Sequence, residues 1–315
     1  MTVAARSDRT TTVMGGQQWA LLFVLAVIWG SSFFFFKILV GALPPLTVVL
    51  GRVGIAAIIM NLWLALRQDF MPRSARLWLS FAIMGLLNNV LPFTLIAFGE
   101  TRISGGLASI LNATTPLFTV LLAHVLTANE KLTPGRSVGV LAGFAGVAVI
   151  VGPAAFAGLG QGDLVGPAAC LLGALSYAFA GLYGRRFKAL PAIKVATGQV
   201  SASTLILIPL VAGFDRPWTL PMPAGTVWGA MIGIAVLCTV VAYVLYFRIL
   251  AVAGATNLLL VTFLLPGSAL LLGWLFLGET IGLRALGGMA LIGLGLASID
   301  GRPWRLIVGR RARVV

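Results

Sequence analysis

Charged residues are scarce in this sequence, and their scarcity is the first guide to its class. Aspartate, glutamate, lysine and arginine make up only 10% of the 315 residues, 59% are apolar, and the mean hydropathy is +1.04. A soluble domain is about one-quarter charged, so the composition excludes a chain built to face water. The net charge of +14 would indicate nucleic-acid binding in a soluble protein. Here the basic residues gather in short connections between apolar runs, as in membrane proteins, so no nucleic-acid partner is expected.

The sequence also has few residues suited to catalysis, metal binding or redox chemistry. Its two cysteines, Cys170 and Cys238, lie within apolar segments and are expected to be buried, without a disulfide or a metal site. No G-x-x-x-x-G-K-[ST] motif is present, which excludes direct ATP drive by this chain. A serine protease would need a serine–histidine pair, and His124 with Ser268 is the formal candidate. We therefore expect a protein without a cofactor that is not an enzyme, with an intramembrane enzyme as the alternative.

Acidic residues are especially rare, and their positions narrow the function further. All 8 aspartates and glutamates fall in tails, loops or helix ends. A proton-driven exporter of cationic drugs usually needs an acid within the membrane, and a magnesium-dependent enzyme acting on diphosphates needs clustered acids. The sequence therefore disfavours both classes. Two of the acids, Glu130 and Glu279, are expected to stabilise the turn into the following helix.

Apolar runs long enough to cross a bilayer recur ten times. A hydrocarbon core of about 30 Å requires about 20 mostly apolar residues in a helix. The first run is full length and lacks a clear cleavage site, so we expect it to be retained rather than removed as a signal. Residues 1–17 and 301–315 are expected to be tails. The sequence predicts an all-α integral membrane protein with ten transmembrane helices, over residues 19–39, 45–66, 77–98, 104–127, 136–152, 164–184, 192–212, 225–247, 257–277 and 284–299.

Arginine and lysine are distributed unequally between the two sides of this predicted bundle. If the N-terminus is cytoplasmic, the inside connections carry basic clusters within residues 67–76 and 185–188. The outside connections carry only Arg102, Arg216 and Arg284. The positive-inside rule then places both termini in the cytoplasm, in a bacterial-type inner (plasma) membrane that the chain crosses many times.

The two halves of the chain resemble each other. "ALPPLTVVLGRV" (42–53) and "ALPAIKVATGQV" (189–200) align without a gap. The halves, 18–152 and 153–300, each hold five predicted spans, and because five is odd the second copy must enter the membrane upside down. Inverted repeats around a shared central site are the architecture of alternating-access transporters; a duplicated scaffold without transport is the alternative. The matched landmarks are Arg52 with Gln199, Trp78 with Trp228, Phe93 with Tyr243, Pro116 with Pro266, and Glu130 with Glu279.

Three segments carry a family resemblance: "WGSSF" (29–33) and the two long stretches 105–147 and 254–296. They resemble the two halves of EamA-type carriers of the drug/metabolite transporter superfamily, in particular the amino-acid-exporter branch, over nearly the whole chain. The resemblance implies ten helices around a central cavity and export of amino acids or related small metabolites. Export of drugs or of other metabolites is the alternative. We expect the small-molecule substrate and the lipid bilayer to be the partners of a monomer or weak homodimer; Gly139 and Gly143 suit close packing within the chain or against a second copy.

One face of the first predicted helix combines aromatic rings with a positive charge. Trp29, Ser32, Phe36 and Lys37 lie one or two helical turns apart on that face. Lys37 and Arg52 are expected at similar depth near the outer side. We hypothesise that this face lines the outer part of the cavity and that Lys37 favours a substrate carboxylate. In the alternative, Lys37 extends to the membrane interface while Arg52 pairs with helix-end carbonyls.

A deeper set of uncharged polar and aromatic residues completes the predicted substrate cavity. Such groups suit a small amphiphilic solute, although serine, threonine and asparagine also bridge membrane helices. Pro116 and Pro266 each remove a backbone donor within a predicted helix at matched positions, and are interpreted as hinges. The lone His124 could relay a proton or could simply be packed. The predicted cavity residues of this deeper set are Asn88, Asn89, Asn112, Thr115, Tyr177, Tyr243, Tyr246 and Thr262.

Overall fold

The computed structural model describes residues 15–128, 130–151, 164–258, 260–280 and 282–300, and within these ranges all regular structure is helical. Among the described residues, eight helical segments are long and apolar enough to cross a membrane, and two further apolar helices, Val261–Leu277 and Leu283–Ile299, are shorter. Each predicted apolar run overlaps one of these ten segments. The predicted tails fall almost wholly on residues outside the described part, although the first helix begins at Gly16.

In chain order the α-helices are α1 (Gly16–Val40), α2 (Pro45–Leu66), α3 (Ala75–Gly85), α4 (Leu91–Glu100), α5 (Gly105–Asn112), α6 (Thr115–Leu126), α7 (Pro134–Val151), α8 (Val165–Tyr183), α9 (Ala192–Phe214), α10 (Gly225–Ala235), α11 (Ala242–Leu258), α12 (Val261–Leu277) and α13 (Leu283–Asp300). Short 3₁₀ turns, η3 (Gly184–Phe187) and η4 (Pro217–Thr219), follow α8 and α9.

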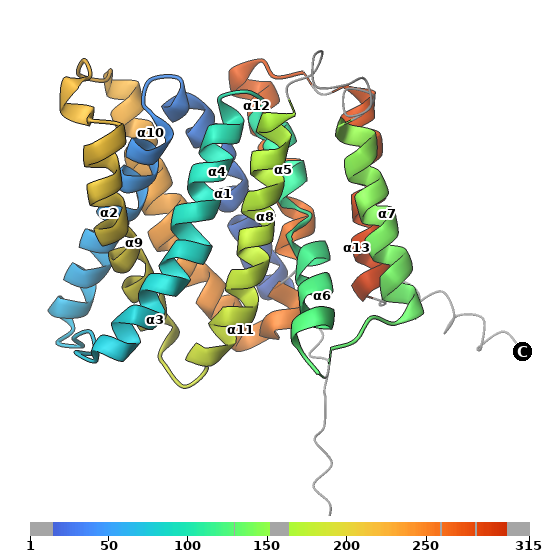
Figure 1. Cartoon of the computed structure of the whole chain (residues 1–315), viewed down its shortest axis with the longest axis horizontal. Helices are drawn as coiled ribbons and strands as arrows, with labels where there is room; N and C mark the ends of the chain where they lie inside the picture. The colour runs from blue at the N-terminus through green and yellow to red at the C-terminus, as the bar shows by residue number, and fades with distance from the viewer. Residues whose placement is uncertain (1–14, 129, 152–163, 259, 281, 301–315) are drawn as a thin grey trace, which may run out of the picture.

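The helices stand side by side in a bundle, with α7 and α13 together at one end of the view in Figure 1. Helix α1 packs on α12, α4 on α8, and α2 on α9. A chain this apolar must satisfy its backbone hydrogen bonds internally, which helices do. Buried apolar residues from helices of both halves, including Phe36, Val53 and Ile234, form the main core.

Small residues bring α7 and α13 into close contact. A Cβ atom added at Gly139 would lie 2.5 Å from the carbonyl oxygen of Gly295, and one added at Gly146 would lie 2.6 Å from that of Gly288. Only glycine allows backbones to approach so closely. Of the two roles that the sequence left open for Gly139 and its neighbours, the structure therefore shows packing within one chain.

Two π-helical segments, which no pattern in the sequence predicts, interrupt the longest helical runs of the described chain. Segment η1 (Leu86–Val90) joins α3 to α4, and η5 (Val236–Val241) joins α10 to α11. They occupy corresponding positions in the two halves, eight residues after the matched Trp78 and Trp228. π-Helical turns occur frequently at functional sites, and both of these contribute residues to the centre of the bundle.

The two predicted hinge prolines lie in different surroundings. A turn at Ala113 and Thr114 separates α5 from α6, and Pro116 follows in the first turn of α6. There its missing N–H breaks no helical hydrogen bond. Pro266 lies inside α12, where a proline does remove one. The hinge role of both residues stays a prediction.

Candidate substrate-binding site

A cavity of about 670 Å³ lies at the centre of the bundle, and its wall includes residues from both halves of the chain. The wall extends to the connection between α8 and α9, where it includes Phe187, Lys188 and Leu190. In the other direction it extends to Phe36 and Ile96, near the last turns of α1 and α4. Its size is that of a typical small-molecule site.

Most of the residues predicted from the sequence are gathered around this cavity. Lys37 and Asn89 are the predicted residues that do not line it. For the others, contact with a substrate stays a prediction. The predicted residues in the wall are Trp29, Ser32, Phe36, Asn88, Asn112, Thr115, Tyr177, Tyr243, Tyr246 and Thr262.

Lys37 lies beyond the end of the cavity, in contrast to the expectation that it faces the substrate. Its Nζ atom donates hydrogen bonds to the carbonyl oxygens of Glu100 and Ile103, both at 2.8 Å. Glu100 is the last residue of α4 and Ile103 follows it; the last carbonyls of a helix lack partners within the helix. Lys37 therefore pairs with carbonyls at the end of a helix, the contact that the alternative hypothesis assigns to Arg52.

Glu279 lies at the same end of the bundle, and its contacts differ from the predicted ones. Its carboxylate oxygens accept hydrogen bonds from the backbone N–H groups of Gly105 at 2.9 Å and Gly106 at 3.1 Å. These are the first residues of α5, so a second-half carboxylate caps a first-half helix, where negative charge is favourable. The Glu100 side chain is fully buried nearby, and within the described residues neither of its carboxyl oxygens has a hydrogen-bond partner.

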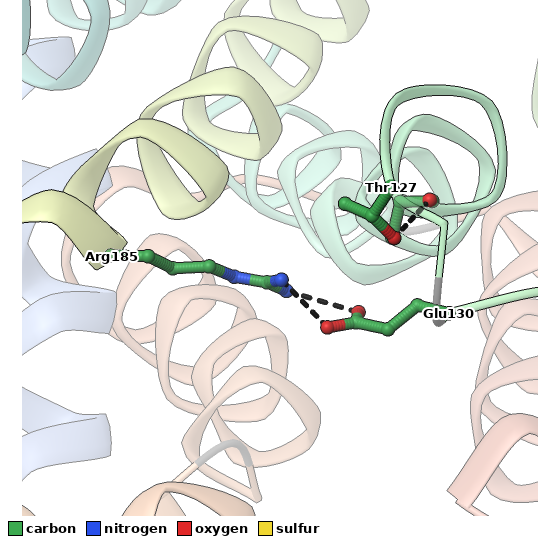
Figure 2. A network of polar contacts seen from close by, with 4 residues as sticks. Thr127, Glu130 and Arg185 are labelled. Carbon is green, nitrogen blue, oxygen red and sulfur yellow. Dashed lines mark hydrogen bonds and ion pairs between the residues drawn. The ribbon is translucent and has the colours of Figure 1, made fainter.

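At the opposite end, Glu130 also departs from its predicted role in the turn. Figure 2 shows Arg185, after α8, pointing at Glu130 in the connection between α6 and α7. The Arg185 Nη1 and Nη2 atoms donate to the two carboxylate oxygens at 2.6 and 3.0 Å. These hydrogen bonds hold the pKa of Glu130 below its usual value. Both side chains are more than 40% exposed, so the pair contributes little stability.

Arg52, on α2, is the charged residue found deepest in the cavity wall. It is only 4% exposed. Its guanidinium lies over the Phe93 ring, 3.8 Å from the ring centroid. The Nε atom donates to the Thr239 hydroxyl at 3.1 Å, and Nη2 donates to the Cys238 carbonyl at 3.3 Å. Both acceptors belong to η5, so a first-half helix binds the π-helical segment of the second half.

A neutral polar network lies at the corresponding place in the other half. Asn88 donates to Gln199 at 3.1 Å, and the Gln199 amide donates to the Tyr243 hydroxyl at 3.0 Å. Tyr243 donates to Asn89 at 3.3 Å, and Asn89 donates to Ser203 at 3.1 Å. Asn89 therefore does not line the cavity but binds Tyr243, which does. Sequence reasoning did not select Gln199, although its alignment with Arg52 was the signal that pointed to it.

The formal serine–histidine pair is not assembled. The Ser268 hydroxyl donates to the carbonyls of Ala26 and Leu265, each at 2.9 Å. The His124 Nδ1 atom accepts from the backbone N–H of Leu132 at 3.1 Å. Within the described residues no hydrogen bond joins the two side chains, so this arrangement lacks the geometry of nucleophilic catalysis.

Comparisons with known proteins indicate a membrane transporter. The sequence profile of the EamA-like transporter family matches residues 17–152 and again residues 164–299. The uncharacterized transporter YoaV of Bacillus subtilis is 24% identical over 273 residues, covering 86% of this chain and 92% of that protein. The uncharacterized inner membrane transporter YedA of Escherichia coli K12 is 28% identical over 270 residues, covering 82% and 83%. A solved crystal structure superposes with a TM-score of 0.63 at 19% identity, over 90% of this chain and 97% of the other, which shows a shared fold. This multi-pass membrane protein belongs to the EamA-like transporter family.

Proposed function

We propose that this protein is a secondary transporter that exports amino acids or related small metabolites by alternating access. The observation that carries the proposal is the central cavity. Both halves line it, it reaches one end of the bundle, and contacts between the halves at Glu279 cover the other end. A carrier needs such a site, available to one side at a time.

We further propose that the chain forms ten transmembrane helices in two inverted five-helix repeats, residues 18–152 and 153–300. The family profile matches the chain twice, and the π-helical segments η1 and η5 recur at corresponding positions, which supports a repeat. Because each half holds an odd number of spans, its copy is inverted.

In the proposed orientation both termini are cytoplasmic, and the chain lies in the bacterial inner membrane. The basic connection after α8, with Arg185, Arg186 and Lys188, is then cytoplasmic under the positive-inside rule. The cavity extends to this connection, so the described conformation would take up substrate from the cytoplasm, as an exporter must.

The wall chemistry supports a small amphiphilic substrate. Rings such as Trp29 and Tyr177 offer apolar shelter, while Asn88 and Thr262 offer hydrogen-bonding groups. Export of drugs or of other metabolites is the competing substrate class. We propose a monomer or weak homodimer as the working unit, without a cofactor.

Flux across a membrane tests the proposal directly. The purified protein is reconstituted into liposomes, and radiolabelled amino acids are followed one by one, with and without a pH gradient. We expect saturable flux that Tyr177→Ala reduces, because Tyr177 lines the cavity. Leu205→Ala is the matched control, since Leu205 is 65% exposed on the outside of the bundle. Vesicles that stay impermeable to every amino acid would refute amino-acid export, and impermeability to a wider metabolite set would refute transport.

A further inference from the structure

The charges around the central cavity have one sign. Of the residues that line it, Arg52 and Lys188 are the charged ones, and neither an aspartate nor a glutamate is among them. Lys188 is exposed at the α8–α9 connection, and Arg52 is buried deep in the wall. A cleft with fixed charges of one sign concentrates ions of the opposite sign, so this cavity favours anions over cations.

The carboxylates of the described part of the chain are all placed away from Arg52. Asp69 pairs with Lys194 at 2.6 Å. Asp215 accepts from the backbone N–H and the hydroxyl of Thr47, at 2.7 and 2.9 Å. The other acids with described side chains lie at the two ends of the bundle, as set out above. Arg52 therefore forms no ion pair with any described residue, whereas buried charges in proteins are normally paired.

The guanidinium is nevertheless held in a defined position. The Phe93 ring and the two acceptors on η5 fix its plane, and Phe36 lies 5.2 Å from it, ring centroid to Cζ. Among the described residues no acceptor binds Nη1. An arginine stacked on a ring keeps its planar fork of donors in one orientation, which lowers the entropic cost of binding a ligand.

We infer that Arg52 is the anion anchor of the cavity and binds the carboxylate of an organic acid or amino acid. The carboxylate meets the guanidinium through Nη1 and Nη2, while the apolar body of the solute lies among rings such as Trp29 and Tyr246. This inference rests on the proposed function and narrows its substrates to solutes with a free carboxylate; cationic drugs are excluded.

The second half of the chain shows that a side chain can hydrogen-bond the two halves together without carrying a charge. Gln199, which aligns with Arg52, is also buried in the wall and also hydrogen-bonds across the two halves, to Asn88, yet it is neutral. Where the role is to join helices, a glutamine amide is sufficient. The positive charge at position 52 places one fixed cation deep in the cavity wall, which suits a substrate with one anionic end.

Four solutes that share one branched alkyl chain test the inference: leucine, 4-methylpentanoate, 4-methylpentanamide and 3-methylbutylamine. A ligand that binds only the folded protein raises the melting temperature, to an extent set by the logarithm of the ratio of its concentration to its Kd. Thermal unfolding of the full chain in detergent, measured over a concentration series, therefore yields an apparent Kd for each solute. We expect 4-methylpentanoate and leucine to bind roughly 10- to 100-fold more tightly than the amide, and the amine not to bind.

Arg52→Gln introduces the residue type of the matched position and should abolish the preference for carboxylate over amide. Arg67→Gln is the control, because Arg67 lies at the end of the same helix, stacks on Trp63 and is exposed. Arg52→Lys keeps the charge but loses the fork, so it should retain part of the preference. Equal binding of carboxylate and amide to the unaltered protein, or a preference that survives Arg52→Gln, would overturn the inference. If Arg52→Gln does not fold, Arg52→Lys decides: a reduced preference for carboxylate over amide supports the inference, and an unchanged preference overturns it.

The inference and the proposed function can fail separately. The binding comparison requires no membrane and no flux. Carboxylate selectivity in detergent without flux in liposomes would uphold the anchor and refute transport. Flux of amino acids that is unchanged in Arg52→Gln liposomes would uphold transport and refute the anchor.

Discussion

Removing the charge of Glu279 should open the covered end of the cavity. In the described conformation its two carboxylate oxygens accept the N–H groups of Gly105 and Gly106. Glu279→Gln keeps one acceptor oxygen but replaces the other by an amide NH₂ group, which cannot accept. One charge-assisted hydrogen bond is lost, at a cost of about 2 kcal/mol. This cost falls on the conformation in which the two halves meet here, and it corresponds to about a 30-fold shift of the equilibrium toward the open state.

The shift can be measured as the chemical accessibility of a residue inside that end. Ile96 lines the cavity there and is 2% exposed. Ile96→Cys, in a background with Cys170→Ala and Cys238→Ala, is treated with a membrane-impermeant maleimide from outside intact cells. We expect the labelling rate to rise by up to about 30-fold in Glu279→Gln.

Glu130→Gln is the matched control, because Glu130 aligns with Glu279 but pairs with Arg185 at the other end. That exposed pair contributes about 0–1 kcal/mol, and its loss should not raise labelling from outside. Labelling that is unchanged in Glu279→Gln, or raised equally in Glu130→Gln, would refute the assignment of Glu279 as the contact that closes this end.

Three further predictions concern stability and motion. Lys37→Met should lower the melting temperature, because two helix-end carbonyls lose their donor. The variant should still bind the carboxylate more tightly than the amide. Loss of that preference would show that Lys37 contacts the substrate. Gly146→Ala should destabilise the fold by about 1–3 kcal/mol, because the added Cβ would lie 2.6 Å from a backbone oxygen of α13. Gly135→Ala is the control and should leave the melting temperature unchanged, since a Cβ there meets nothing within 4 Å. Equal melting temperatures of the two variants would contradict the packing. Pro266→Ala should slow liposome flux more than it lowers folded yield. Pro116→Ala should change flux less, because Pro116 lies in the first turn of α6. Equal loss of flux and yield in Pro266→Ala would refute its role as a hinge.

Local sequence patterns were sufficient for the membrane-crossing segments and for the family. Hydropathy over about 20 residues depends on composition alone, so the apolar runs could be read directly, and most of the polar and aromatic residues expected at the cavity do line it. The predicted glycine pair at Gly139 and Gly143 also packs closely, although only the fold shows that Gly139 meets α13 and that Gly143 meets Leu117 of α6.

The roles of the charged residues depended on contacts between distant segments. Lys37 and Arg52 are both bases near the ends of neighbouring helices, and periodicity could not say which one faces the cavity. Helix packing turns Lys37 toward the end of α4 and Arg52 toward η5. Similarly, the aligned Glu130 and Glu279 lie at opposite ends of the bundle and bind different partners, Arg185 and the backbone of α5.

The sequence alone therefore determined an apolar, repeated chain of membrane-crossing helices, because hydropathy and internal similarity are properties of the order of residues. The tertiary structure decided which charge faces the cavity, which carboxylate joins the two halves, and where the π-helical segments lie. These features arise from the rotation and docking of helices far apart in the chain, which no local pattern encodes.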